Sequence, residues 1–147
     1  MRQSARAIVV KNGTLLVMRR RKEGREYYAL IGGGIDAGET PEQALYREVK
    51  EETGITINNH RLVIIQQGGF GRQYIYLCDY VSGEPTLAED SEEAKIHAGG
   101  QNLYQPMWLP IGELPRVTLL PVELKQALIK NLADGFPKEP LTLTIAA

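Results

Sequence analysis

The sequence predicts a single domain of the mixed α/β (α+β) class, in which strands and helices share one core. Three observations favour this class. Short apolar runs rich in β-branched residues, such as 7–10 and 15–18, are separated by turn signals. Two other segments, 41–53 and 121–133, place apolar residues at helical spacing. The length of 147 residues suits one domain with a sizeable core, and no repeat or linker divides the chain.

Composition and charge exclude several other classes of protein. The apolar fraction of 43% and the charged fraction of 24% are ordinary for a soluble globular protein. A net charge of −1 gives no basic field that would attract nucleic acid, so nucleic acid is not an expected partner. No apolar run reaches the ~18–20 residues of a membrane span, and the run before Lys11 is too short for a signal peptide. With Cys78 as the one cysteine, we expect a cytoplasmic protein without an internal disulfide.

The first predicted elements form a β-hairpin. Ala7–Val10 and Leu15–Met18 are short apolar runs, and Asn12-Gly13 between them is a strong hairpin signal. A further strand is predicted at Tyr27–Ile31, and it leads into three consecutive glycines at 32–34. Glycines at such a position allow the backbone to approach a ligand closely.

A basic cluster follows the hairpin directly and consists of Arg19, Arg20, Arg21 and Lys22. It has two interpretations. One is a solvated loop at the end of a strand. The other is a rim that binds the phosphates of a substrate, because arginine side chains match phosphate oxygens with paired donors.

A helix is predicted from Pro41 to Thr53. Thr40 is a good N-cap residue, Pro41 suits the first helical position, and Gln43 lies where it can close a capping box. Gly54 can supply the left-handed residue that ends the helix.

Three glutamates of this helix, Glu48, Glu51 and Glu52, fall on neighbouring positions where their charges repel. Leu45, Val49 and Glu52 follow the spacing of a core-facing stripe, so Glu52 occupies a position that an ordinary amphipathic helix gives to an apolar residue. One interpretation is a solvated acidic face. The other is a site for a hard cation such as Mg²⁺, which prefers carboxylate oxygens and would offset the cost of burying them.

The surrounding residues favour the cation site, because the segment from Gly33 to Ile55 fits the pattern G-x5-E-x7-R-E-U-x-E-E-x-G-U at every position. The fixed residues are Gly33, Glu39, Arg47, Glu48, Glu51, Glu52 and Gly54, and the apolar positions U are Val49 and Ile55. This pattern resembles the signature of the Nudix hydrolases, the family of MutT-like proteins. Ile31 stands where many relatives have proline before the glycines, a departure that leaves the glutamates untouched.

The resemblance implies a Nudix fold, in which a mixed β-sheet is sandwiched between α-helices. It also implies hydrolysis of the pyrophosphate bond in a nucleoside diphosphate linked to another moiety. The implied metal ligands are the Gly32 carbonyl and the carboxylates of Glu48, Glu51 and Glu52, with Mg²⁺ as the expected ion and Mn²⁺ as the alternative. Arg47 joins these glutamates in the implied catalytic set, and its pairing with Glu39 would brace the loop against the helix. Glu39 alternatively serves as a first-turn glutamate favoured by the helix dipole.

The remaining strands are predicted at Leu62–Gln66, Gln73–Val81 and Leu103–Leu109. Cys78, in the second of these, is expected to be a buried apolar residue rather than a nucleophile. Pro121–Ala133 is predicted to be a structural helix, with leucines at i, i+4 and i+8. For the tail, 136–147, the alternatives are an edge strand, a partner contact or a flexible segment.

The segment from Ser82 to Asn102 is a long acidic loop, and loops of this length are usually functional or mobile. In Nudix enzymes a further carboxylate often reaches the metal from outside the signature. Glu92 and Glu93 are therefore candidates for the base that takes the proton of the attacking water, and Glu93 is included in the predicted catalytic set.

Two alternative functions stay open. The first is a Nudix module that binds and senses nucleotides without hydrolysing them. The second is a protein-interaction role resting on the tail and on the predicted strand Gln73–Val81, which carries Tyr74, Tyr76 and Tyr80. The expected partner is a small nucleotide-type molecule and not a membrane; the sequence does not choose its identity. Nor does it decide whether the protein is a monomer or a homodimer.

Overall fold

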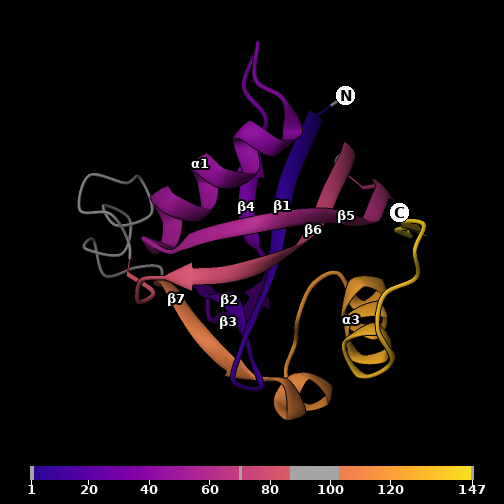
Figure 1. The fold of residues 1–147 in the computed structure, drawn as a ribbon. Helices are drawn as coiled ribbons and strands as arrows, with labels where there is room; N and C mark the ends of the chain where they lie inside the picture. The colour runs from indigo at the N-terminus through magenta and orange to yellow at the C-terminus, as the bar shows by residue number, and fades with distance from the viewer. Residues whose placement is uncertain (1, 70, 87–102, 147) are drawn as a thin grey trace.

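The computed structural model describes residues 2–69, 71–86 and 103–146. Eight strands are present in these ranges (Figure 1). Their bounds are β1 (Arg2–Lys11), β2 (Thr14–Lys22), β3 (Arg25–Ala29), β4 (Ile31–Gly34), β5 (Thr56–Gly68), β6 (Gly71–Ser82), β7 (Leu103–Pro110) and β8 (Leu141–Thr144). The helices in the same ranges are α1 (Pro41–Thr53), α3 (Val122–Asp134) and the 3-10 helix η1 (Ile111–Arg116).

The strands form one mixed sheet with the order β3-β2-β1-β6-β5-β8. Strand β1 is central to it, because β6 runs parallel along one edge while β4 and β2 pair antiparallel with successive parts of the other edge. Strand β7 also pairs antiparallel with β2 and is not part of this linear order. The parallel pairing of β1 with β6 brings the N-terminus of the chain beside residues about seventy positions later.

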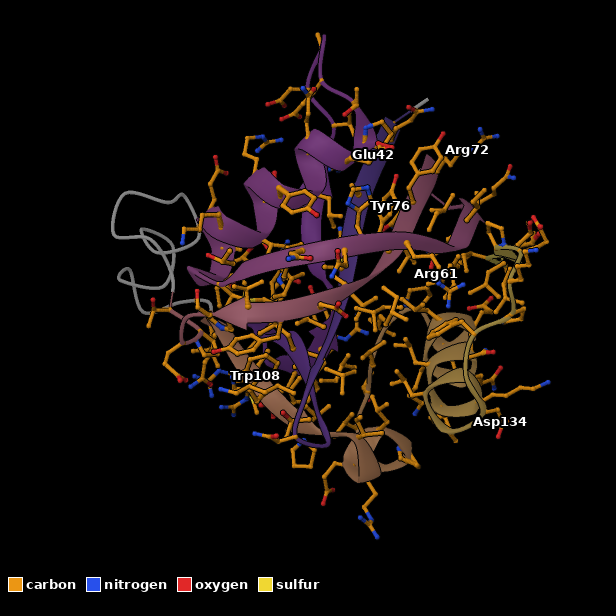
Figure 2. All side chains as sticks on the ribbon, in the orientation of Figure 1. Glu42, Arg61, Arg72, Tyr76, Trp108 and Asp134 are labelled. Atoms are coloured by element: carbon orange, nitrogen blue, oxygen red, sulfur yellow. The ribbon has the colours of Figure 1, made fainter. Side chains whose placement is uncertain are left out.

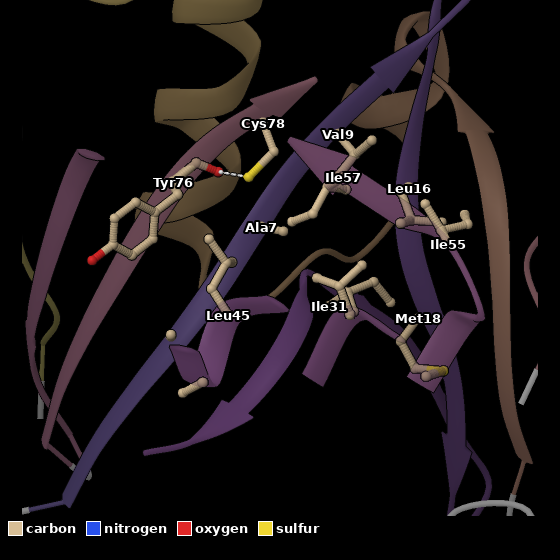
Figure 3. Close-up of a cluster of buried hydrophobic side chains, with 13 residues drawn as sticks. Ala7, Val9, Leu16, Met18, Ile31, Leu45, Ile55, Ile57, Tyr76 and Cys78 are labelled. Atoms are coloured by element: carbon tan, nitrogen blue, oxygen red, sulfur yellow. Dashed lines mark hydrogen bonds between the residues drawn. The ribbon is translucent and has the colours of Figure 1, made fainter. Parts of the chain in front are cut away.

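Two apolar clusters lie on opposite faces of the sheet. Alternate residues of β1, Ala5, Ala7 and Val9, pack with Leu45 and Val49 of α1 in one cluster (Figure 3). The other cluster contains Ile8 of the same strand together with leucines of η1 and α3. Helices α1 and α3 therefore cover opposite faces (Figure 1), which confirms the predicted mixed sheet between helices.

Helix α1 has the predicted bounds, and its ends are capped as expected. The Thr40 hydroxyl accepts a hydrogen bond from the Gln43 backbone at 3.1 Å, while the Gln43 side chain accepts one from the Thr40 backbone at 2.9 Å. Gly54 ends the helix in the left-handed conformation with φ of 73°. These local bonds fix where α1 begins relative to β4, and with it the position of the glutamates.

The predicted hairpin is present, with Asn12 and Gly13 both at positive φ between β1 and β2. The interpretation of 19–22 as a loop was wrong, because these residues continue β2 and pair with both β3 and β7. The single strand predicted at Tyr27–Ile31 divides at the buried Leu30. The division arises because β3 pairs with β2 whereas β4 pairs with β1.

The C-terminal half agrees with prediction in element type and differs in length. The strands predicted at 62–66 and 73–81 are longer at both ends in the structure, where they are β5 and β6. The strand predicted at 103–109 is one residue longer, as β7. Pro121 is the N-cap of α3, and the 3-10 helix η1 was not predicted. Among the alternatives for the tail, the structure contains the edge strand: β8 pairs parallel with β5.

Cys78 is buried among apolar side chains, as predicted (Figure 3). Burial raises the pKa of its thiol to about 12, which keeps the sulfur neutral near pH 7. Within the described residues no helix is long and apolar enough to cross a membrane.

Candidate active site

Two glutamates of α1 lie against the glycines of β4. The backbone N–H of Gly32 donates a hydrogen bond to Oε2 of Glu52 at 3.3 Å. The carboxylate of Glu48 occupies the space beside Gly33, where a Cβ atom would lie 2.7 Å from the Glu48 carboxyl carbon. The absence of a side chain at Gly33 is therefore what admits the Glu48 carboxylate to this position.

Arg47 connects the helix to the loop that precedes it. Its Nε donates to Glu39 Oε2 at 2.6 Å, and one terminal nitrogen donates to Glu39 Oε1 at 3.0 Å and to the Gly34 carbonyl at 3.1 Å. The other terminal nitrogen contacts Glu48 Oε1 at 2.9 Å and Glu51 Oε2 at 3.3 Å. The structure thus contains the Glu39–Arg47 pair, and the same guanidinium orients Glu48.

The charges around Arg47 shift several pKa values. Hydrogen bonds from Arg47 and from the Asp36 backbone lower the pKa of Glu39 to about 2, so Glu39 is ionised at neutral pH. Hydrogen bonding to Glu39 also raises the pKa of Arg47. Burial raises the pKa of Glu48, although the hydrogen bond from Arg47 opposes this change. Because burial disfavours the ionised form of Glu48, a nearby cation would stabilise that form.

Glu48 and Glu52 line a cleft with a volume of about 290 Å³, which we call the carboxylate cleft. Its other lining residues are Arg2, Arg6, Met18, Arg20, Ala29, Leu30, Gly32, Gly33, Gly34 and Tyr104. Three arginines therefore share one cleft with two carboxylates. Such an arrangement can hold a cation and the anionic groups of a ligand side by side.

Arg20 is the member of the basic cluster that lines the carboxylate cleft. Its guanidinium donates to the Tyr104 hydroxyl at 2.5 Å and lies 4.4 Å from the centre of the Tyr104 ring. These contacts hold Arg20 in place. Arg19 pairs instead with Glu26, and both Arg19 and Arg21 line a separate cleft of about 480 Å³. The alternation of side chains along β2 separates the cluster in this way.

Arg6 is a cleft residue that the sequence analysis missed. Its guanidinium donates to Gln73 Oε1 at 2.6 Å and to the carbonyls of Leu30 and Gly32 at 3.0 and 3.3 Å. Burial lowers the pKa of Arg6, while the charges of Glu52 and Glu48 act in the opposite direction. A signal was present, because a lone arginine between Ala5 and Ala7 interrupts an apolar run at the start of a strand.

The predicted metal ligands are only partly brought together. Glu48 and Glu52 line the cleft, whereas Glu51 is 56% exposed and pairs with Arg47. Within 2–69, 71–86 and 103–146 no three histidine, cysteine or carboxylate side chains are arranged as a metal site. The potential ligand atoms that do converge are the carboxylate oxygens of Glu48 and Glu52, and Mg²⁺ prefers oxygen ligands. Burial of Glu48 also favours a cation beside its carboxylate. The residues present therefore fit a hard divalent ion. Glu92 and Glu93 lie outside the described residues.

Comparisons with known proteins agree on one family. The family model of the NUDIX domain matches residues 1–129. The NAD-capped RNA hydrolase NudC of Haemophilus influenzae is 41% identical over 90 residues, which cover 60% of this chain and 31% of that protein. The ADP-ribose pyrophosphatase of Methanocaldococcus jannaschii is 31% identical over 91 residues, covering 58% of this chain and 54% of that protein. The match thus covers about a third of the first of these curated relatives and about half of the second.

Solved structures show the same fold. A NUDIX hydrolase from Nitrosomonas europaea superposes with a TM-score of 0.67 at 18% identity, and the match covers 93% of both chains. The complete signature on α1, the family match over most of the chain and this shared Nudix fold lead to one conclusion: the protein is a member of the Nudix hydrolase family.

Proposed function

We propose that this protein hydrolyses the pyrophosphate bond of a nucleoside diphosphate linked to another moiety, with Mg²⁺ as its metal ion. The observation that supports this proposal best is the carboxylate cleft. Glu48 and Glu52 lie on one wall, and Arg6 and Arg20 line the same space. A pyrophosphate needs both a cation held by carboxylates and direct contacts from arginine. The named relatives, which act on NAD-capped RNA and ADP-ribose, agree with a substrate of this class.

Each residue of the cleft has a distinct role in this proposal. Glu48 and Glu52 are the primary ligands of the metal, and Glu51 joins them by turning away from Arg47. A divalent ion held there would neutralise charge on the pyrophosphate and make the attacking water more acidic. Arg20, fixed by Tyr104, binds a phosphate group, and Arg47 keeps the Glu48 carboxylate oriented. The proton of the attacking water goes to a carboxylate, for which the α1 glutamates and Glu93 are the candidates.

A substrate panel with product analysis tests the proposal. ADP-ribose, NAD⁺, a dinucleoside polyphosphate, a nucleotide sugar and an 8-oxo-purine triphosphate are incubated with the protein and Mg²⁺, then with Mn²⁺. Release of a nucleoside monophosphate from at least one of them is expected. Binding of these compounds without any product would instead favour the sensing module.

The two neighbouring arginines of β2 give a matched test of phosphate binding. Arg20→Ala should raise KM by about tenfold or more with a smaller effect on kcat, because it removes a charge-assisted contact to the bound substrate. Arg21→Ala removes the same charge from an exposed position outside the carboxylate cleft, so KM should stay within about twofold. Steady-state kinetics at two salt concentrations measure both variants. Equal KM values for Arg20→Ala and the wild type would remove Arg20 from the phosphate site.

Gly33→Ala tests whether the Glu48 carboxylate must occupy the space beside β4. The new Cβ would lie 2.7 Å from the Glu48 carboxyl group, a flexible end that can move without unfolding the protein. We expect kcat to fall by about 10–10²-fold, as misplacement of a catalytic group by 1 Å can cause. Gly112→Ala is the control, because no atom lies within 4 Å of its added Cβ. Thermal unfolding should show both variants folded; a Gly33→Ala enzyme with wild-type kcat would contradict the prediction.

A further inference from the structure

A second, smaller cleft lies where the first residues of β1 meet the first residues of β6. Its volume is about 150 Å³. We call it the arginine pocket, and its lining residues are Arg2, Ser4, Arg6, Gly71, Arg72 and Gln73. Arg2 and Arg6 also line the carboxylate cleft, so the two spaces adjoin. A substrate long enough to reach past Arg2 and Arg6 would therefore contact both spaces.

The lining of the arginine pocket carries charge of one sign. Three of its six residues are arginines, and none of the six is acidic or aromatic. The carboxylate cleft differs, because there Glu48 and Glu52 balance the arginines. A pocket with this lining attracts an anion directly, without a metal ion. It offers no ring on which a nucleobase could stack.

One arginine of this pocket is held in place by hydrogen bonds. Arg6 is fixed by Gln73 and by the carbonyls of Leu30 and Gly32. Gly71 lies so close to β1 that a Cβ there would be 2.0 Å from the Arg2 carbonyl oxygen, which keeps the two strands in contact at the floor of the pocket. The site is thus built from paired strands rather than from flexible loops.

Arg72 is the arginine that lines the arginine pocket and not the carboxylate cleft, whereas Arg2 and Arg6 line both. Its Nε is closed to solvent and has no hydrogen-bond partner among the described residues. An oxyanion in the open space of the pocket would therefore meet the terminal nitrogens of Arg72 rather than its Nε. Figure 2 shows Arg72 on β6, away from Asp134 of α3.

From these features we propose that the arginine pocket binds a phosphomonoester carried by the substrate at a point remote from the scissile pyrophosphate. The inference rests on the proposed hydrolysis and narrows its substrate to nucleotide derivatives with such an additional phosphate. The volume of about 150 Å³ is several times the ~30 Å³ that one water occupies in the liquid, room for a tetrahedral phosphate group. Three guanidinium groups match the two negative charges and three oxygens of a phosphomonoester.

Binding of small adenosine nucleotides tests the pocket without any need for turnover. Calorimetry with Mg²⁺ compares AMP, adenosine 2′,5′-bisphosphate and adenosine 3′,5′-bisphosphate. At least one bisphosphate should bind the wild type about tenfold or more tighter than AMP, the effect of one or two charge-assisted hydrogen bonds. Arg72→Gln should lose this advantage while keeping the affinity for AMP. Arg2→Gln is the second variant in case Arg72→Gln does not fold; because Arg2 also lines the carboxylate cleft, its readout is the ratio of bisphosphate affinity to AMP affinity rather than the AMP affinity itself.

Arg61→Gln is the matched control, because Arg61 on the neighbouring strand β5 donates to the Pro137 carbonyl and lines neither cleft (Figure 2). It should keep the bisphosphate advantage. Bisphosphates that bind no tighter than AMP, or an advantage that survives in both pocket variants, would overturn the inference. Turnover of NAD⁺ and NADP⁺ is followed in parallel. Arg72-dependent bisphosphate binding with no turnover of NAD⁺, NADP⁺ or any compound of the substrate panel would support the pocket while refuting the proposed hydrolysis.

Discussion

Replacing Glu52 with glutamine should lower kcat at least 10²-fold, the largest effect that we expect from a single substitution in this protein. Glu52 lies on the core-facing side of α1, where its Oε2 accepts the Gly32 N–H and its side chain lines the carboxylate cleft. The amide of glutamine keeps the size and one acceptor oxygen but loses the charge that, in the proposed function, would hold a divalent ion. The loss should therefore appear in the chemical step rather than in folding.

Steady-state kinetics at saturating Mg²⁺ measure this effect, and Glu113→Gln on η1 is the control because it makes the same charge change at a surface pair with Arg116. Without metal, Glu52→Gln should unfold at the same temperature as the wild type or slightly higher, because one of two neighbouring like charges is gone. Near-normal turnover of Glu52→Gln would exclude Glu52 as a metal ligand.

Arg47→Ala is expected to affect stability and activity together. The guanidinium donates to Glu39, Glu48, Glu51 and the Gly34 carbonyl, so its removal leaves four residues without that partner. Since the side chain is 28% exposed, water will compensate in part. We expect the free energy of unfolding to fall by about 1–3 kcal/mol, and kcat to fall because Glu48 loses its orientation. Arg116→Ala, whose pair with Glu113 is largely exposed, should change stability little.

Urea denaturation across the acid range distinguishes this ion pair from a general packing effect. Arg47 and the Asp36 backbone hold the pKa of Glu39 at about 2 in the folded protein, below its ordinary value of 4.5. A lowered folded-state pKa stabilises the protein above the unfolded-state pKa, and this contribution is lost as the pH falls from about 4.5 towards 2. In Arg47→Ala the pKa of Glu39 should return towards 4.5, so stability should fall less steeply over this range. Parallel pH profiles for both proteins would contradict this account.

The parts of the fold that local chemistry determines could be predicted from the sequence. Thr40, Gln43 and Gly54 mark both ends of α1 because each acts through bonds to residues within four positions. The hairpin at Asn12-Gly13 is local in the same sense. Spacing along α1 likewise predicted that Glu52 borders the core, and the resemblance to the Nudix signature implied the Glu39–Arg47 pair that the structure contains.

Features that depend on distant pairing could not be predicted. The division of 27–31 at Leu30 follows from a change of partner strand, which no local pattern encodes. Arg6 meets Gln73 only because β1 and β6 run in parallel. Predicting that Arg20 faces a different cleft from Arg19 and Arg21 required knowing that β2 extends through these residues. In a loop the side chains would not alternate between two faces. Long-range register therefore accounts for most of what the sequence analysis missed.

The first half of strand β1 divides two tasks between its two faces, whereas further along, at Ile8, the even-numbered face also packs in the core. Its odd-numbered residues Ala5, Ala7 and Val9 pack against α1, while the even-numbered Arg2, Ser4 and Arg6 line the two clefts. Substitutions at the even positions can therefore alter ligand preference while the packing of the odd positions is retained. Related proteins could diverge in substrate along this one strand without repacking their interior. The same separation makes these three even positions the natural starting point for redesigning specificity in the laboratory.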